Sequence, residues 1–115
     1  GIKLSLFIEA NPADIDAAAE IGADIVELHT GRYCYNATQR CSELIRIQAA
    51  AKYTSKIGIE CHAGHGLCYD TVGKIAAIPA IKELNIGHFL IGESIFTGLK
   101  EAIIRMRELM DKARL

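Results

Sequence analysis

The sequence predicts an α/β fold of four strand–helix units, which corresponds to half of a TIM (βα)8 barrel. Short apolar β-prone runs alternate with helical patterns, as is typical of a parallel sheet with right-handed crossovers. Four units average about 29 residues each, so eight would need about 230, within the size range of such barrels. No linker or low-complexity segment interrupts residues 1–115, and we therefore expect a single domain. A small open sheet is the alternative.

The first unit starts with a short apolar strand at residues 4–8. Asn11 follows as a helix N-cap, and Pro12 takes the first helical position, where an amide proton is not needed. The helix carries an apolar stripe and ends at Gly22.

The second and third units repeat this arrangement. The run Ile-Val-Glu-Leu-His predicts a strand at residues 25–29, and a polar loop separates it from a long helix at about 38–56. The third strand is expected at 57–62, and a short helix at 71–77 ends before Pro79.

The last unit is expected to begin with one helical turn at residues 80–84, followed by a strand at 88–92. A long amphipathic helix at 97–113 completes it. The Glu101/Arg105 pair in this helix has the i,i+4 order that supports an exposed face.

The composition narrows the possible partners. The 13 basic and 14 acidic residues leave a formal net charge of -1 without a block of like charges, so we expect no nucleic-acid partner. No apolar run of about 18 residues and no leader is visible, so we expect no membrane partner and a cytoplasmic location.

Four cysteines without a CxxC pair are expected to be reduced. Because the chain starts at Gly1 and not at methionine, we expect a piece of a longer protein.

Polar residues gather where the expected strands end, which is where parallel sheets bind ligands. Glu9, His29–Thr30, His65–Gly66 and Gly92–Ser94 occupy these positions, so four loops could meet over one pocket. Gly92–Ser94 suits an anion, because the amide groups at a helix start carry partial positive charge. Glu93 opposes an anion there, and a plain turn is the alternative.

Glu27 and His65 are the candidates for chemistry. Glu27 interrupts an apolar strand on the same face as His29, and a carboxylate inside a barrel needs a ligand or a polar partner. His65 lies between two glycines, where an imidazole can transfer protons near neutral pH. The alternatives are a carboxylate on an exposed strand face and a loop histidine bound to a carbonyl group. His62 is expected to face the pocket without a proton-transfer role.

Zinc binding is a weaker hypothesis. His62, His65, Cys61 and Cys68 offer nitrogen and sulfur ligands. Their spacing is loose, no nearby carboxylate completes a known pattern, and Cys61 should point to the opposite side of its strand from His62. We therefore expect no metal.

Five tracts, in one order and spacing, extend over nearly the whole chain. They are LSLFIE at 4–9, IVELHTG at 25–31, AGHGL at 63–67, IAAIP at 75–79 and ELNIGH at 83–88. These tracts resemble the second half of the pyridoxine 5'-phosphate synthase family, and AGHGL with ELNIGH is far more specific than a lone glycine motif. The resemblance implies that residues 1–115 are the carboxyl-terminal half of a (βα)8 barrel.

The resemblance also implies a transferase of vitamin B6 biosynthesis without a redox or metal cofactor. The family condenses 1-deoxy-D-xylulose 5-phosphate with 3-amino-2-oxopropyl phosphate to give pyridoxine 5'-phosphate, phosphate and water. By resemblance, His65 is the proton donor and Glu27 stabilises the transition state. Gly66, Gly87 and His88 contact the amino-ketone phosphate, although Gly87 and His88 lie before the expected fourth strand and not after it.

Three features distinguish this chain from the family pattern. Glu93 stands where the family often has a basic residue, and Cys61–His62 replaces a tract that usually ends in a small polar residue, a change that would alter the pocket. The family's first half supplies a general-base histidine, a second glutamate and phosphate-binding arginines, and no residue here corresponds to them. We therefore expect the missing amino-terminal half-barrel as a partner and an inactive fragment. A homo-oligomer is also expected, because open edge strands invite pairing. The alternative is a non-catalytic phosphate-binding (βα)4 domain.

Overall fold

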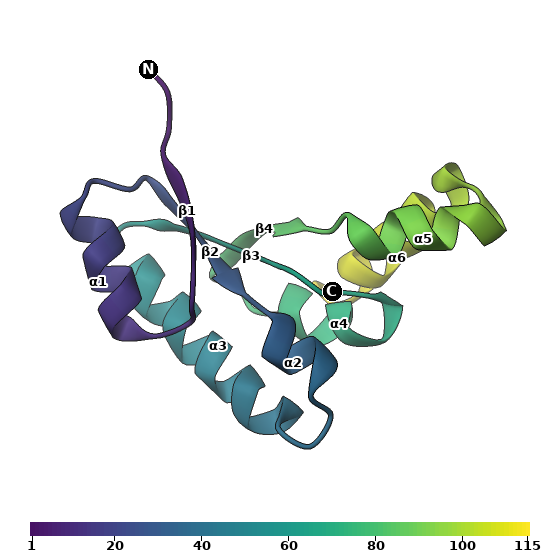
Figure 1. Cartoon of the computed structure of the whole chain (residues 1–115), viewed down its shortest axis with the longest axis horizontal. Helices are drawn as coiled ribbons and strands as arrows, with labels where there is room; N and C mark the ends of the chain where they lie inside the picture. Colours follow the sequence, from purple (N-terminus) through teal and green to yellow (C-terminus); the bar gives the residue numbers. More distant parts are fainter.

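The computed structural model describes residues 1–115 as a four-stranded parallel sheet with six helices. Each strand pairs with the next one in the sequence, so the sheet order is β1-β2-β3-β4 (Figure 1). The strands are β1 (Ser5–Ile8), β2 (Ile25–His29), β3 (Glu60–Gly64) and β4 (Ile81–Asn85). The helices are α1 (Pro12–Glu20), α2 (Gly31–Tyr35), α3 (Arg40–Lys56), α4 (Tyr69–Ala76), α5 (His88–Thr97) and α6 (Leu99–Lys112). The chain is an α/β half-barrel, as the sequence predicts.

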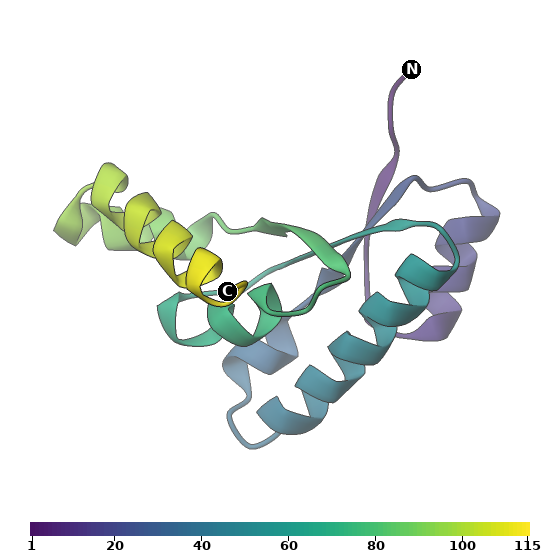
Figure 2. The same ribbon diagram turned by 180° about the vertical axis from the view of Figure 1, so that it is seen from behind.

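One face of the sheet is covered by helices, and the other face is open. Val26, Leu28 and Cys61 are buried on the covered face, where α1 and α3 lie against the strands (Figures 1 and 2). On the open face the register aligns one residue from each strand in a row, namely Phe7, Glu27, His62 and Glu83. Three of these four side chains are ionisable, and they lie on the face that becomes the interior when such a sheet closes into a barrel.

The start and the end of α1 confirm the prediction from the sequence. The Asn11 side chain accepts a hydrogen bond from the backbone N–H of Asp14 at 2.9 Å, and Pro12 is the first residue of the helix. Gly22 follows the helix with a φ of 82°, a conformation that favours glycine. Local side-chain chemistry is sufficient to place this helix.

The fourth unit contradicts the prediction. Residues 81–85, expected as a helical turn, form β4, and residues 88–92, expected as a strand, lie in α5. The register shifts by one residue where β3 meets β4, so Ile81 and Leu84 both pack toward the core although they are three residues apart. A spacing of three is also a helical spacing, which is why the pattern misleads.

Two further boundaries differ from the expected ones. The third strand begins at Glu60 and not at residue 57, because Ile57 and Gly58 close α3, with Gly58 at a φ of 84°. The loop expected after β2 contains the short helix α2. That helix brings the segment after β2 close to the end of β3 and so contributes to the candidate site.

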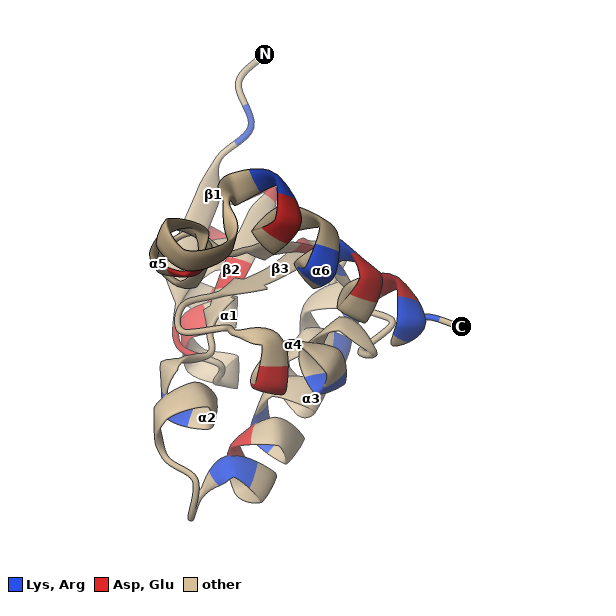
Figure 3. Ribbon diagram, turned by 90° about the vertical axis from the view of Figure 1, so that its right-hand side faces the viewer, with Lys and Arg blue, Asp and Glu red and all other residues tan.

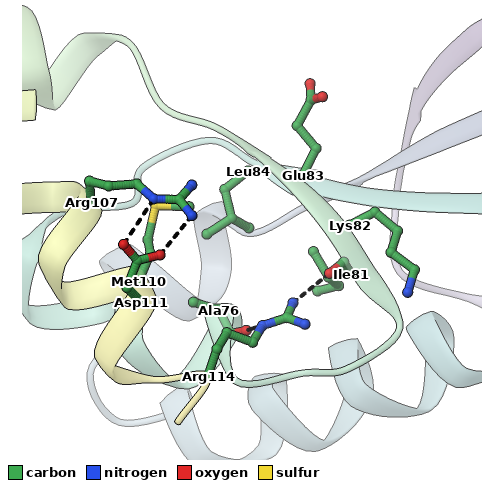
Figure 4. Close-up of a pocket in the computed structure, with 9 residues that line it drawn as sticks. All are labelled: Ala76, Ile81, Lys82, Glu83, Leu84, Arg107, Met110, Asp111 and Arg114. Atoms are coloured by element: carbon green, nitrogen blue, oxygen red, sulfur yellow. Dashed lines mark hydrogen bonds and ion pairs between the residues drawn. The ribbon is translucent and has the colours of Figure 1, made fainter.

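Helix α6 packs on α4 and α5, and residues of α6 and β4 line a common cavity. The Arg114 guanidinium, just beyond α6, donates to the carbonyl oxygens of Ala76 and, at 2.6 Å, Ile81 (Figure 4). It also donates to the carbonyl oxygen of Ile78 at 3.1 Å. A cavity of about 250 Å³ lies between these groups. Both arginines that line it are engaged, Arg114 by backbone carbonyl groups and Arg107 by Asp111, so we assign this cavity a structural role.

Basic and acidic residues are interspersed along α6 (Figure 3). Arg107 and Asp111 form an ion pair there at 2.6 Å. None of the six helices combines the length and the apolar character that a membrane crossing requires.

Candidate functional site

A cavity of about 940 Å³ lies at the carboxyl ends of the strands. Its walls come from β1 and β2 and from the segments that follow β2, β3 and β4. The five residues that the sequence analysis gave a catalytic or substrate-binding role all line this cavity, and they are Glu27, His65, Gly66, Gly87 and His88. Glu9, His29 and Thr30, which were expected at the same pocket, do not line it. The cavity occupies the position where parallel α/β sheets bind their ligands.

The loop that carries His65 is held by Thr30, the residue after β2. The Thr30 hydroxyl lies 2.7 Å from the carbonyl oxygens of both Gly64 and His65, and the Thr30 backbone N–H donates to Gly64 at 2.9 Å. Thr30 is fully buried, whereas His65 is exposed with a φ of 85°. That φ is uncommon outside glycine, so the anchored carbonyls hold His65 in a conformation it rarely adopts.

The imidazole of His65 contacts aromatic rings and makes no hydrogen bond within the chain. It stacks on the ring of His29, with centroids 4.7 Å apart and planes inclined by 22°, while Phe7 and Tyr35 lie at 6.5 and 6.0 Å. The alternative of a histidine bound to a carbonyl group therefore does not describe this ring, whose nitrogens remain available to a ligand. His29 itself received no role from the sequence, although it lies on the same face of β2 as Glu27.

Two glycines allow the backbone to approach these side chains. Gly66 has a φ of 81°, and a Cβ there would lie 2.8 Å from the ring of Tyr35. A Cβ at Gly64 would collide with the Glu27 carboxylate and lie 2.8 Å from the carbonyl oxygen of Asn85. Both positions therefore require glycine for reasons of space, and Gly66 requires it for its backbone conformation as well.

Glu27 extends from β2 into the cavity. Its side chain is half-buried and has no hydrogen bond or ion pair with another side chain of the chain. The expected burial is thus only partial, and the expected polar partner is not supplied by this chain. The carboxylate can accept hydrogen bonds from a ligand in the cavity.

Gly87 and His88 reach the cavity because β4 ends at Asn85. Gly87 is the N-cap of α5 and His88 its first helical residue, so the free amide groups of this helix start adjoin the cavity. Such a helix start favours anions. Residues 92–94, where the sequence analysis placed the anion-binding turn, lie inside α5 instead. That expectation was wrong because the fourth strand was misplaced.

His62 lies on the open face of the sheet and does not line the cavity. Its ring is engaged by two carboxylates, with Nε2 2.7 Å from Glu60 and Nδ1 3.7 Å from Glu83. The hydrogen bond from His62 lowers the pKa of Glu60. Cys61 points to the opposite face, where burial raises the pKa of its thiol to about 12.

The zinc hypothesis finds no support in this arrangement. Cys61 and His62 lie on opposite faces of β3, and His62 is already paired with carboxylates. No group of three or more histidine, cysteine, aspartate or glutamate side chains is placed to hold a metal ion.

The fold and the cavity define an α/β half-barrel with a carboxylate, an imidazole and a helix start at its strand ends. The family model described as "Pyridoxal phosphate biosynthesis protein PdxJ" matches residues 1–112, and the chain belongs to this family. Pyridoxine 5'-phosphate synthases are similar to it over its whole length. The protein of Rhodospirillum rubrum is 57% identical over 115 residues, which cover 98% of this chain and 46% of the relative.

Two further relatives give the same result. The pyridoxine 5'-phosphate synthase of Caulobacter sp. is 56% identical over 120 residues, which cover 100% of this chain and 48% of that protein. The corresponding protein of Jannaschia sp. is 57% identical over 119 residues, which cover 99% and 48%. The chain thus spans about half the length of the curated relatives it matches.

Proposed function

We propose that this chain forms the carboxyl-terminal half of a pyridoxine 5'-phosphate synthase. The whole protein would condense 1-deoxy-D-xylulose 5-phosphate with 3-amino-2-oxopropyl phosphate and release pyridoxine 5'-phosphate, phosphate and water. The observation that carries the proposal is the convergence of Glu27, His65 and Gly87 on one cavity from three separate segments. Membership of a family named for pyridoxal phosphate biosynthesis supports it.

In this proposal His65 donates a proton to the reacting substrate. Its imidazole reaches the cavity without a competing hydrogen bond, and an imidazole can lose a proton near neutral pH. The half-buried carboxylate of Glu27 would stabilise positive charge that develops in the transition state. Two substrates with anionic phosphate groups need charge compensation, and the start of α5 supplies it for one of them.

The amino-ketone phosphate is assigned to the α5 side of the cavity. Gly87 and His88 lie at the helix start, and Gly66 leaves room for a ligand between His65 and the Tyr35 ring. The cavity contains no arginine that could hold the second phosphate. We propose that the other half of the barrel supplies these arginines and the general base.

Because the catalytic and phosphate-binding groups would be divided between the two halves, we propose that the 115-residue chain alone is inactive. The open face of the sheet, with its row from Phe7 to Glu83, would then meet the amino-terminal half-barrel. The edge strands β1 and β4 of this half would pair with the edge strands of that half-barrel, which closes the sheet. We further propose that the whole protein is a cytoplasmic homo-oligomer.

The test compares the full-length polypeptide with residues 1–115 alone. Both are incubated with the two substrates, and pyridoxine 5'-phosphate and free phosphate are measured together. The proposal expects equal amounts of both products from the full-length polypeptide and none from the half. A full-length polypeptide that binds the ketone phosphates but releases no phosphate would contradict it and would indicate a non-catalytic phosphate-binding domain.

A further inference from the structure

His29 lies at the end of β2, and its imidazole is the nearest ring to that of His65. The two rings stack with centroids 4.7 Å apart, and Phe7 lies 5.1 Å from His29 at a tilt of 41°. His65 has no hydrogen bond to orient its ring, so contact with this neighbour sets the direction of the side chain. We propose that His29 is a positioning residue, which holds the imidazole of His65 over the cavity. This inference rests on the proposed role of His65 as proton donor.

His29 is held from behind by the backbone. The N–H of Gly31 donates to Nδ1 of His29 at 3.2 Å, so Nδ1 is the acceptor in this contact. The imidazole of His29 cannot rotate about its Cβ–Cγ bond without losing that hydrogen bond. The ring therefore presents a constant face to His65.

The carboxylate of Glu9 lies beside His29 and outside the stack. The Glu9 carboxylate at the end of β1 lies 3.8 Å from Nδ1, too far for a hydrogen bond, and its second oxygen lies 3.4 Å from Arg46 of α3. Arg46 also pairs with Glu43 at 2.7 Å. Because Arg46 engages Glu9, the carboxylate is fixed beside His29 and does not enter the stack.

Gly31 supplies independent support for the stack. A Cβ at this position would collide with Cε1 of His29 and would lie 3.1 Å from Cδ2 of His65. Gly31 does not have a positive φ, so its backbone conformation is open to other residues. The space needed by the two imidazoles is therefore the reason that the structure gives for glycine here.

Simple aromatic packing is the competing explanation. The side chain of His29 is 27% exposed and Phe7 is 55% exposed, so this cluster lies at the rim of the cavity and not in the core. Removing His29 should therefore affect the orientation of His65 more than the stability of the fold. If His29 positions His65, its replacement should lower turnover. If His29 only packs against its neighbours, its replacement should lower stability.

Two substitutions in the full-length polypeptide separate them. His29→Phe keeps a ring under His65 and loses the Nδ1 acceptor, whereas His29→Asn keeps a polar acceptor and loses the ring. In the stack, ring currents move the NMR signals of the His65 ring protons upfield. We expect this displacement in the wild type and in His29→Phe, and its loss in His29→Asn.

Turnover should follow the ring signals. A misplaced catalytic group typically costs about 10- to 100-fold in rate, so kcat should fall by about that factor in His29→Asn and by less than about 3-fold in His29→Phe, with KM unchanged in both. Gly31→Ala, which forces the rings apart without removing either, should also lose kcat. Thermal unfolding of each variant identifies any loss that is due to instability.

The outcomes separate this inference from the proposed function. If His29→Asn keeps both the ring signals and kcat, or if His29→Phe loses kcat as much as His29→Asn, His29 is not a positioning ring. If the full-length wild type forms no product, the synthase proposal fails, and the ring signals alone still decide whether His29 holds His65.

Discussion

The hydroxyl of Thr30 and the carbonyl oxygen of His65 lie 2.7 Å apart, although 35 residues separate them in the sequence. This contact joins the end of β2 to the loop after β3 and fixes the backbone from which the His65 ring extends. The same hydroxyl also reaches the carbonyl of Gly64 at 2.7 Å. One buried side chain therefore secures the loop that carries the candidate proton donor.

Thr30→Val should destabilise this loop, because the shape is kept while the hydrogen-bond donor is lost. The Gly64 carbonyl keeps the backbone N–H of Thr30, but the His65 carbonyl loses the hydroxyl, which should lower the free energy of unfolding by about 1–3 kcal/mol. Urea unfolding of the full-length polypeptide measures this, and kcat should fall as well. Thr38→Val is the matched control, since Thr38 is exposed and bonds only Asn36. Equal stability of the two variants would show that Thr30 does not hold the loop.

Gly66→Ala should be more harmful than Gly58→Ala. Both glycines have a positive φ, at 81° and 84°, but only at Gly66 would the new Cβ meet a ring, that of Tyr35. The conformational strain alone should cost about 1–2 kcal/mol at each site. Urea unfolding should show an additional loss for Gly66→Ala, and Tyr35→Ala in the same chain should reduce that addition, leaving the contact with Cβ of Cys34. Identical losses at the two positions would refute the close approach to Tyr35.

Inorganic phosphate should perturb the start of α5 and leave α6 unchanged. The first amide groups of α5 adjoin the cavity, whereas α6 begins outside it and has Glu101 in its first turn. Backbone amide signals of the full-length polypeptide, recorded by NMR during a phosphate titration, should shift at His88 and not at Leu99. Equal shifts at both helix starts would mean that phosphate binds helix starts non-specifically, and would contradict a phosphate site at the start of α5.

Cys61 should make stability fall at alkaline pH. Burial raises the pKa of its thiol from an ordinary 9.0 to about 12. Below pH 9.0 the thiol is protonated in both states and has no effect, whereas at higher pH the unfolded chain ionises first and is favoured. The free energy of unfolding should therefore decline between these values, and less steeply in Cys61→Ala than in Cys41→Ala, whose thiol is exposed. Parallel declines would contradict this account.

The sequence predicted most of the fold where the signal is local. Asn11, Pro12 and Gly22 mark the ends of α1 by their own chemistry, and in β2 only Glu27 interrupts the apolar run before the strand ends at His29. The fourth strand could not be predicted in the same way. The register shift at β4 replaces the alternation of a strand with the three-residue spacing of Ile81 and Leu84.

In the candidate site, too, some residues could be identified from local sequence patterns, whereas other contacts depend on the tertiary fold. Glu27 and His65 could be selected from the sequence because a carboxylate within an apolar strand and a histidine between glycines are local patterns. The stack of His29 on His65 and the space left by Gly31 depend on the loop after β3 folding back over the end of β2. No local pattern encodes that contact.

The most direct test of the account is the single-turnover rate of the full-length polypeptide carrying His65→Asn, measured with both substrates bound. A proton donor typically contributes about 10²- to 10⁴-fold, so the rate of pyridoxine 5'-phosphate formation should fall by that factor while substrate affinity and the unfolding midpoint stay close to those of the wild type. His62→Asn serves as the control, because His62 does not line the cavity, and it should keep its turnover. A His65→Asn variant that forms product at the wild-type rate would contradict the assignment of this cavity as the site of the chemistry.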